Sequence, residues 1–451
     1  MLQVGLTSND KNSSFMTNLT KIYGWGRYNQ QDAYLHAPTS CASLESTAKQ
    51  QNNVLARGMG RSYGDSANAL NVLQTTYINH FIEFDRATGK LTAEAGITLR
   101  DILEVIVPSG WFLPVTPGTS YVTLGGAIAS DVHGKNHHIA GTFGQHVKSL
   151  SMLLGTGEVV ITSPEHHADL FHATCGGMGL TGIIMSATIQ LLPIKSSFIL
   201  QKTIRADCVE VACESFESNS DATYSVAWID CLNKGKSLGR SVIMLGEHAE
   251  QGGLEIDTRQ KVSMPFSTPS ALLNRFTMKA FNAAYWQKSK QNVSQTVALM
   301  PYFYPLDAIG EWNRLYGKKG FIQFQCVLPK NDGVANMRKL LNEISSSGEG
   351  SFLAALKQFG VSNENLLSFP TEGYTLALDF KASETAIKMV KRLEDMTVDM
   401  GGRLYLTKDA VMYESTFKST YPNWEKFEAV REQYGAIGKF SSTQSKRLGL
   451  A

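Results

Sequence analysis

The segment "ARGMGRSYGDSA" from Ala56 to Ala67 holds Gly58, Gly60 and Gly64 within seven positions. Glycine lets the backbone approach a ligand closely, leaves the amide N–H groups unshielded and reaches positive φ without strain. Such a loop is suited to bind the phosphates of a nucleotide. Because many glycine-rich loops are ordinary tight turns between strands, this interpretation needs support from other segments.

Two familiar phosphate-binding motifs do not fit this loop. A Rossmann fingerprint needs its third glycine one residue earlier and a helix directly after it, whereas "DSANALNVLQTTYI" begins with turn formers and ends in β-branched and aromatic residues. A P-loop needs Gly-Lys-Ser/Thr, but Gly60 is followed by Arg61 and Ser62. The sequence therefore predicts a loop between two strands.

Two more glycine-rich segments follow. Residues 114–147, "PVTPGTSYVTLGGAIASDVHGKNHHIAGTFGQHV", contain six glycines, and residues 173–193, "ATCGGMGLTGIIMSATIQLLP", contain four before an alternating strand pattern. Three such loops, each beside a strand, favour a ligand of dinucleotide size over simple turns.

The group "HGKNHH", from His133 to His138, raises the question of a metal site. Metal sites usually combine histidines at defined spacing with carboxylates, and His137 and His138 are adjacent. The six cysteines include no CxxC pair, so neither a zinc site nor a disulfide framework is indicated. We expect no metal, histidines that hold loops and ligand in place, and reduced thiols.

The overall composition is that of an ordinary globular protein of two or three domains. Lys+Arg number 42 against 40 Asp+Glu, and the net charge of +2 gives no electrostatic reason to expect nucleic acid. No signal peptide is recognisable, and no apolar run reaches the roughly 18 to 20 residues of a membrane span. The sequence predicts a cytoplasmic protein that meets a membrane only from its surface.

The elements that position these loops can be predicted in outline. "FIEFD" and "KLTAEAG" flank a turn with Gly89, which indicates a hairpin. A helix is expected to begin at Thr98, which forms a capping box with Asp101, and to end at Pro108 and Gly110. Leu99, Ile102, Leu103 and Ile106 would form its apolar face. From about Val54 to Pro193 the pattern is α+β.

After Pro193 the pattern changes. The strand-like runs "YSVAWIDC", "SVIML", "FIQFQCVLP" and "YTLALDF" are mixed with the helical patterns "VANMRKLLNEISSSG" and "ASETAIKMVKRLEDMTVDMGG". This combination predicts a second domain, in which helices cover an antiparallel sheet.

Residues 264–290, "MPFSTPSALLNRFTMKAFNAAYWQKSK", predict a helix that starts at Thr268 and Pro269. Leu272, Phe276, Ala280 and Ala284 follow at i+4 spacing, and Arg275, Lys279, Lys288 and Lys290 lie among or just after them. Such a basic amphipathic stretch could rest on a membrane surface or guide a lipid tail. An ordinary core-facing helix is the commoner explanation.

The three glycine-rich loops, in this order and followed by a mixed sheet, resemble the flavin-binding domain of the vanillyl-alcohol oxidase family. The resemblance is closest to the members that oxidise polyprenyl-phosphate-linked pentoses. Four matching stretches are "GWGR" at 24–27, "ARGMGRSYGD" at 56–65, "VTLGGAIASDVHGKNHH" at 122–138 and "GLTGIIM" at 179–185. Four more are "PLDAIGEWNRLYG" at 305–317, "SFLAALKQFG" at 351–360, "GGRLYLTKD" at 401–409 and "KRLGL" at 446–450.

The resemblance implies a two-domain α+β fold. Residues 1–195 would form a PCMH-type FAD-binding domain, and residues 196–402 a substrate-binding domain with an antiparallel sheet and helices. Residues 403–451 would be a C-terminal segment that returns to the FAD-binding domain.

The resemblance also implies bound FAD. Covalent flavin attachment in this family is expected to need a Gly-His-Ser sequence in the first loop; here Arg61 precedes Ser62, and residues 117–130 contain no Cys, so we expect non-covalent FAD. The implied cofactor-binding residues are Ala56, Arg57, Gly58, Met59, Gly60, Arg61, Ser62, Tyr63, Gly64, Asp65, Ser66, Gly118, Thr123, Leu124, Gly125, Gly126, Ser130, Asp131, Val132, His133, Ile184 and Tyr405. Backbone amides at Gly58–Gly64 and Gly125–Gly126 would bind the diphosphate.

For catalysis the resemblance implies Lys408 at the reacting hydroxyl, as base or hydrogen-bond donor, with Tyr63 and His133 near the flavin ring. From the residues alone, a surface salt bridge between Lys408 and Asp409 is the more ordinary role. The implied substrate-binding residues are Trp228, Gln323, Gln325, Lys357, Thr375 and Ala377. Thr375 and Ala377 replace an Asn and a Cys of the family member compared, which leaves the exact sugar open.

The implied reaction is oxidation of the 2-hydroxyl of a lipid-linked pentose of the decaprenylphosphoryl-ribose kind to a 2-keto sugar. This would be the first half of an epimerisation in cell-envelope polysaccharide synthesis, completed by a separate NAD(P)H-dependent short-chain reductase. A peripheral membrane contact would suit such a substrate. Two alternatives are a soluble sugar, alditol or aldonolactone oxidase that uses oxygen, and a flavin-binding partner protein without turnover.

Overall fold

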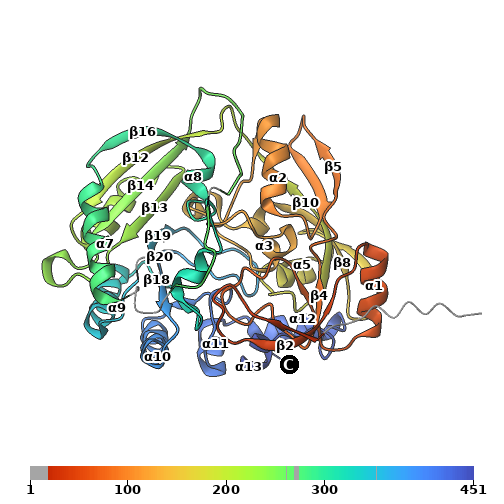
Figure 1. Ribbon diagram of the computed structural model, residues 1–451. Helices are drawn as coiled ribbons and strands as arrows, with labels where there is room; N and C mark the ends of the chain where they lie inside the picture. Colours follow the sequence, from red (N-terminus) through yellow and green to blue (C-terminus); the bar gives the residue numbers. More distant parts are fainter. Residues whose placement is uncertain (1–18, 261, 269–273, 352, 451) are drawn as a thin grey trace, which may run out of the picture.

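The computed structural model describes residues 19–450 apart from 261, 269–273 and 352. Two groups of strands lie side by side (Figure 1). Residues 19–193 build the group drawn in red to yellow, and a large sheet drawn in green and blue faces it. The C-terminal helices run along the lower side of the molecule.

Strands and helices alternate irregularly in the first part of the chain. Its strands are β1 (Leu19–Ile22), β2 (Gln31–His36), β3 (Val54–Arg57), β4 (Asn71–Gln74), β5 (Phe81–Asp85), β6 (Lys90–Glu94), β7 (Trp111–Phe112), β8 (Val147–Leu153), β9 (Val159–Thr162), β10 (Ile183–Gln190) and β11 (Leu192–Pro193). Its helices are α1 (Cys41–Gln50), α2 (Leu99–Ile106), α3 (Leu124–Ala129), α4 (His137–Ala140) and α5 (Ala168–Thr174), with 3₁₀ turns at Val107–Ser109 and Phe143–His146.

The first glycine-rich loop connects β3 to β4, as predicted. These two strands are parallel neighbours in a four-stranded sheet of order β1-β2-β4-β3. A second, antiparallel sheet has the order β5-β6-β10-β8-β9 and contains the predicted hairpin, whose Gly89 has φ 70°. The predicted helix is α2: Thr98 and Asp101 form its capping box, and its four apolar positions are fully buried.

The large sheet contains eight antiparallel strands in the order β16-β12-β14-β13-β19-β20-β18-β21. Its strands are β12 (Phe198–Ala206), β13 (Tyr224–Ile229), β14 (Ser241–His248), β16 (Val293–Ala298), β18 (Phe321–Pro329), β19 (Ala354–Phe359), β20 (Gly373–Lys381) and β21 (Arg403–Leu404). The helices of this part are α6 (Val209–Glu217), α7 (Arg275–Lys288), α8 (Leu299–Phe303), α9 (Gly333–Ser347) and α10 (Glu384–Asp399). Short elements at β15 (Val262–Ser263), β17 (Ile309–Gly310), Gly235–Ser237 and Trp312–Tyr316 complete it.

The two faces of this sheet differ because successive side chains of a strand point to opposite sides. One face packs against α6, α9 and α10 and is mostly apolar; it includes Phe324 and Cys326 of β18 and Leu376 of β20. The alternate residues, among them Gln323 and Gln325, lie on the face toward the first part of the chain. The prediction of an antiparallel sheet covered by helices is confirmed.

The helix predicted to start at Thr268 and Pro269 begins later. Its N-cap is Asn274, whose side chain accepts from the amides of Phe276 and Thr277. Pro269 and Leu272 lie outside the described residues. The side chains of Phe276, Ala280 and Ala284 are exposed, so the expectation that this row faces the core is wrong. Trp286 and Asn282 face the sheet instead.

Residues after β21 form α11 (Glu414–Thr420), α12 (Trp424–Gln433) and α13 (Thr443–Arg447). These helices return to the first part of the chain, where Val54 bridges to Phe440 and the Asn68 carbonyl accepts from Thr443. Together the elements form the predicted α+β fold. No described helix is long and apolar enough to cross a membrane.

Candidate active site

A cavity of about 330 Å³ lies where the glycine-rich segments meet the polar face of the large sheet. The predicted site residues that line it are Ala56, Gly58, Met59, Gly60, Arg61, Ser62, Tyr63, Ser66, Gly118, Thr123, Gly125, Gly126, Ser130, Val132, His133, Ile184, Gln323, Gln325, Lys357, Ala377, Tyr405 and Lys408. The cavity lining therefore includes residues from seven of the eight stretches on which the resemblance was based, all except residues 446–450.

Seven predicted residues do not border the cavity. Four of them support its loops from behind. Arg57 donates to the carbonyls of Tyr23 and Ala67, and Asp65 is paired with Arg447. Gly64 packs against the Asp409 carbonyl, which a Cβ would approach to 1.9 Å, and Leu124 is fully buried in the apolar core.

The other three form contacts between elements. The Asp131 carboxylate is fully buried and accepts from the Gly144 amide and from three side chains, those of Asn363, Asn365 and Ser368. The Thr375 hydroxyl donates to the Cys326 carbonyl. Trp228 packs against α7, in a cluster with Val242 and Trp286.

The first glycine-rich loop offers unused hydrogen-bond donors to the cavity. Within the described part of the chain, the amides of Met59, Gly60, Arg61 and Ser62 have no backbone or side-chain acceptor. Gly58 allows Thr123 to pack against the loop, since a Cβ there would lie 2.2 Å from the threonine Oγ1. The loop can therefore bind anionic oxygens through its backbone.

The second glycine-rich segment contributes shape rather than free amides. The Gly125 amide donates to the Ala95 carbonyl, and the Gly126 amide donates to the Thr123 side chain. The expectation that these two amides bind phosphate is therefore wrong, because Ala95 and the α3 N-cap Thr123 already accept from them. At Gly118 a Cβ would meet no atom within 4 Å, so this glycine borders open space.

The sheet supplies a polar floor to the cavity. Gln325 on β18 is paired with Ala377 on β20, which is paired with Ala355 on β19. Cross-strand partners point to the same face. Lys357, two residues after Ala355, lies on that face too, and all four residues line the cavity. Trp228 is the next cross-strand partner beyond Ala355, so the row leads from the cavity toward α7.

His133 lies at the inner end of the cavity. The Gln325 side-chain amide donates to its Nε2 at 3.2 Å, which leaves Nδ1 with the hydrogen and without an acceptor among the described residues. Burial first, and then the charge of Lys357, lower the pKa of His133 well below its usual value. His133 is therefore a neutral ring with one unused donor.

The Lys408 amine lies against Tyr63 of the first loop. Its Nζ lies 3.7 Å from the centre of the Tyr63 ring. Burial lowers its pKa to about 7; Lys357 acts in the same direction, and Asp379 opposes it. A lysine of this kind can exchange a proton near neutral pH.

Asp379 on β20 lies behind the cavity wall. It is buried, accepts from the Gln323 amide and accepts from the Tyr316 hydroxyl at 3.3 Å. Burial raises its pKa to about 7, although the Gln323 hydrogen bond and Lys408 favour the carboxylate. Lys408 and Asp379 therefore influence each other's protonation without an ion pair between them.

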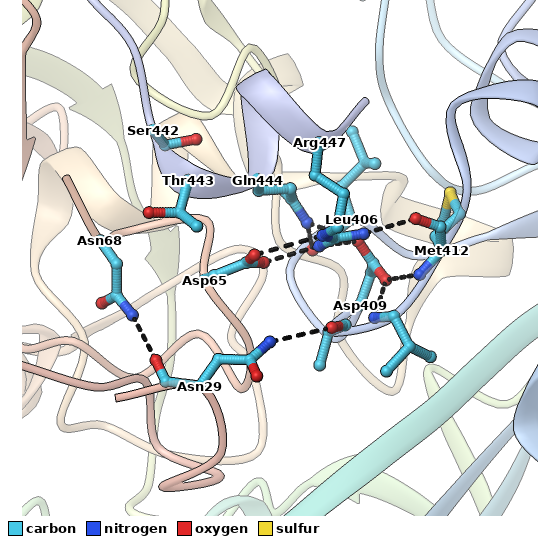
Figure 2. Close-up of polar contacts among 12 residues, drawn as sticks. Asn29, Asp65, Asn68, Leu406, Asp409, Met412, Ser442, Thr443, Gln444 and Arg447 are labelled. Carbon is cyan, nitrogen blue, oxygen red and sulfur yellow. Dashed lines mark hydrogen bonds and ion pairs between the residues drawn. The ribbon is translucent and has the colours of Figure 1, made fainter. Parts of the chain in front are cut away.

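A buried ionic network holds the segment around Lys408 in place. Figure 2 shows Arg447 between Asp65 of the first glycine-rich loop and Asp409. The Arg447 Nη2 lies 2.7 Å from Asp65 Oδ1 and 2.9 Å from Asp409 Oδ2. Gln444 and the amides of Val411 and Met412 also donate to Asp409. The alternative of a Lys408–Asp409 salt bridge is therefore wrong, since Arg447 and these donors take up Asp409.

Some lining residues were not predicted as site residues. They include Trp25, Leu306, Trp312 and Thr407. Trp25 and Trp312 lie in the quoted stretches "GWGR" and "PLDAIGEWNRLYG", so these matches could have identified both residues as site residues. Among the described residues no cluster of His, Cys, Asp or Glu could hold a metal ion.

The residues present fit the flavin dinucleotide that the resemblance implies. Four free backbone amides suit the diphosphate, the open space at Gly118 admits a bulky group, and the unused His133 Nδ1 is a donor at the inner end. Tyr405 closes this end: it stacks on Phe369 and donates to the Ser130 carbonyl.

Known proteins share this sequence over different lengths. Residues 37–163 match a family model described as an FAD binding domain. The chain is 35% identical to decaprenylphosphoryl-beta-D-ribose oxidase of Mycolicibacterium smegmatis, over 97% of this chain and 99% of that protein. It is 21% identical to L-gulono-1,4-lactone dehydrogenase of Mycobacterium tuberculosis, over 91% and 94% of the two chains. It is 28% identical to L-gulonolactone oxidase of Bos taurus, over 95% and 98%.

Proposed function

This chain belongs to the family of FAD-dependent oxidases that includes decaprenylphosphoryl-beta-D-ribose oxidase, and we propose that it oxidises the 2-hydroxyl of a polyprenyl-phosphate-linked pentose to a 2-keto sugar. The predicted family and cofactor are confirmed: the protein is an FAD-dependent oxidoreductase. Family membership does not support the alternative of a flavin-binding partner without turnover. The observation that carries the substrate proposal is the similarity over nearly the whole chain, including the half that contains the polar sheet face.

FAD, when bound, would supply the two-electron oxidant for the carbon that carries the reacting hydroxyl. The hydroxyl proton needs a separate acceptor, and Lys408 Nζ takes it in this proposal. The pKa of Lys408, lowered to about 7, makes the amine available in its neutral form. Removal of hydride and proton together leaves the ketone, so the reaction balances with a single base.

The polar sheet face orients the sugar in this proposal. Gln323 and Gln325 offer amide groups to hydroxyls, and Lys357 offers a buried amine whose pKa burial lowers to about 8. Gln323 is also bonded to Asp379, which fixes the direction of its amide. Such bonds position the carbinol carbon and exclude water from the reacting bond.

We also propose that α7 rests on a membrane surface. Phe276 is 82% exposed and Phe281 is 47% exposed, while Lys279 and Lys288 are exposed on the same helix. Aromatic and basic side chains together suit an interface with anionic lipid. Tyr285 of α7 packs on Trp228, next to the row of residues that leads to the cavity. This arrangement supports passage of a lipid-linked substrate from a membrane.

Three further proposals follow from the same reaction. A separate NAD(P)H-dependent short-chain reductase completes the epimerisation, because a 2-keto product must be reduced to give the epimer. A cytoplasmic location is supported by the six unpaired cysteines. The division at residues 195 and 402 is supported by the change of sheet between β11 and β12 and by the return of the chain after β21.

The test is anaerobic mixing of the FAD-loaded protein with farnesylphosphoryl-β-D-ribose while the visible flavin absorbance is followed. Bleaching that free ribose, alditols and aldonolactones do not cause supports the proposal. Rapid bleaching by an aldonolactone would instead favour the second candidate, a lactone oxidase, which the similarity to the gulonolactone enzymes keeps open.

A further inference from the structure

Arg61 presents its guanidinium to the cavity from a stack of aromatic rings. The guanidinium carbon lies 3.7 Å from the centre of the Trp25 ring and 5.3 Å from that of Tyr121. Arg61 lines the cavity beside Trp25. Stacking of this kind fixes the plane of the guanidinium and leaves the N–H groups at its edge available.

These N–H groups have no acceptor in the described part of the chain. Asp307 and Glu311 are the carboxylates whose charges act on the pKa of Arg61. Asp307 already accepts from the Thr119 hydroxyl and from both the amide and the hydroxyl of Ser120. Glu311 lies 3.5 Å from Arg314. An arginine on a cavity wall without a partner is suited to bind an anionic ligand.

The position of Arg61 agrees with a phosphate next to the reacting sugar. Arg61 is two residues from Tyr63, whose ring lies against the Lys408 amine. Trp25, Trp312 and Leu306 form an apolar part of the same cavity wall, and the Trp25 ring lies directly against the Arg61 guanidinium. A prenyl phosphate ester of a sugar likewise carries its hydrocarbon directly next to its phosphate. Lys357 lies on the sheet floor near Phe359 and His133, on the sugar side.

We propose that Arg61 binds the phosphodiester of the lipid-linked sugar, and that Trp25, Trp312 and Leu306 bind its first isoprene units. This inference rests on the proposed function. It differs from the expectation that Arg61 binds FAD: the loop amides of Met59 to Ser62 provide for the cofactor's diphosphate, which leaves the side chain for the substrate. An arginine edge binds two phosphate oxygens at once.

The test compares FAD-loaded wild type with Arg61→Gln and Arg61→Lys. The oxidised proteins are titrated with farnesyl phosphate and with farnesylphosphoryl-β-D-ribose, and the perturbation of the flavin spectrum gives each Kd. Arg61→Gln is expected to raise both Kd values about tenfold to a hundredfold, since charged hydrogen bonds are lost. Arg61→Lys retains the positive charge but lacks the paired N–H donors of a guanidinium. Its Kd values should lie between those of wild type and Arg61→Gln. Flavin content should remain at one per chain.

Two matched controls separate phosphate binding from other effects. Arg100 also lies 5.3 Å from the Tyr121 ring and bonds to its hydroxyl, but it does not line the cavity. Arg100→Gln should therefore leave both Kd values unchanged. The uncharged farnesyl β-D-riboside should bind wild type and Arg61→Gln equally well.

Two results would overturn the inference: loss of FAD from Arg61→Gln, or unchanged Kd values for both phosphate esters. Either would mean that Arg61 does not bind the phosphate of the substrate. If farnesyl phosphate binds wild type in an Arg61-dependent way but the pentose ester does not reduce the flavin, the inference stands and the proposed sugar is wrong. The experiment therefore distinguishes an error in the role of Arg61 from an error in the proposed substrate.

Discussion

The ammonium group of Lys408 lies 3.7 Å from the centre of the Tyr63 ring, and this contact joins the C-terminal part of the chain to the first glycine-rich loop. A backbone hydrogen bond joins the same two segments, because the Tyr63 amide donates to the Thr407 carbonyl. Burial raises the pKa of Tyr63 well above its usual value, so its ring stays neutral beside the amine. The proposed base and the cofactor loop are therefore parts of one rigid contact.

Substitution of Lys408 by Met should abolish most of the chemistry while FAD remains bound. Loss of a positioned general base typically lowers the rate by about 10²- to 10⁴-fold. The measurement is the anaerobic rate of flavin bleaching at saturating farnesylphosphoryl-β-D-ribose. Lys319→Met, at an exposed lysine, is the matched control and should behave as wild type. Undiminished bleaching in Lys408→Met would remove Lys408 from the mechanism.

The rate of flavin reduction should rise with pH through about 7 and then level off. Below this pH Lys408 is protonated and cannot accept the hydroxyl proton; above it the amine is neutral. Asp379 raises the pKa of Lys408, so Asp379→Asn should move the midpoint to lower pH. The profile is measured by single-turnover mixing at each pH. A midpoint that stays in place in Asp379→Asn would contradict this coupling.

Arg447→Met should destabilise the protein by roughly 3–5 kcal/mol, because it leaves buried charges unpaired. The carboxylates of Asp65 and Asp409 are each 2% exposed, and Arg447 is the cation that pairs with both. The measurement is the free energy of unfolding in urea, with FAD retention recorded alongside. Arg392 pairs with Glu343 but is 67% exposed, so Arg392→Met should change stability by less than about 1 kcal/mol. Equal effects of the two substitutions would reject the role of the network.

Gly118→Val should weaken FAD binding without weakening the fold. A Cβ at this position meets no atom within 4 Å, so the apoprotein should lose less than about 0.5 kcal/mol. Bound FAD would meet the added methyl groups, and overpacking of about 1–3 kcal/mol corresponds to an affinity loss of roughly 5- to 150-fold. The comparison is Gly58→Val, whose Cβ would lie 2.2 Å from Thr123 Oγ1 and which should destabilise the apoprotein itself. Urea unfolding and fluorescence titration with FAD distinguish the two.

Phe276→Ser should reduce binding to vesicles that contain phosphatidylglycerol by roughly 10- to 150-fold, since insertion of one phenylalanine contributes roughly 1.5–3 kcal/mol. Cosedimentation with the vesicles measures the effect, and high salt should weaken wild-type binding because Lys279 and Lys288 contribute charge. Val361 is 76% exposed outside α7, and Val361→Ser should have no effect. Equal binding of wild type and Phe276→Ser would exclude α7 as the contact.

Local structure in the first part of the chain follows from the sequence because short-range interactions decide it. The capping box of Thr98 and Asp101 forms within one turn of helix, and Gly89 takes the positive φ that its hairpin needs. The prediction for α7 was wrong because long-range packing, and not short-range interactions, decides which face of a helix is buried. The i+4 spacing of Phe276, Ala280 and Ala284 describes one helix face but does not say whether the sheet covers it. That face is exposed, and Asn282 and Trp286 face the sheet instead.

By itself the sequence predicted a dinucleotide-sized ligand from its glycine-rich loops between strands, and its resemblance pointed to the family. It did not determine which side chains border the cavity. Asp65 and Asp131 lie in the loops yet turn away from it, because each has a buried partner far along the chain. Likewise, Asp409 meets Arg447 and leaves Lys408 without a carboxylate partner. Only the tertiary structure decides such pairings, since a buried charge takes whichever partner folding brings within reach.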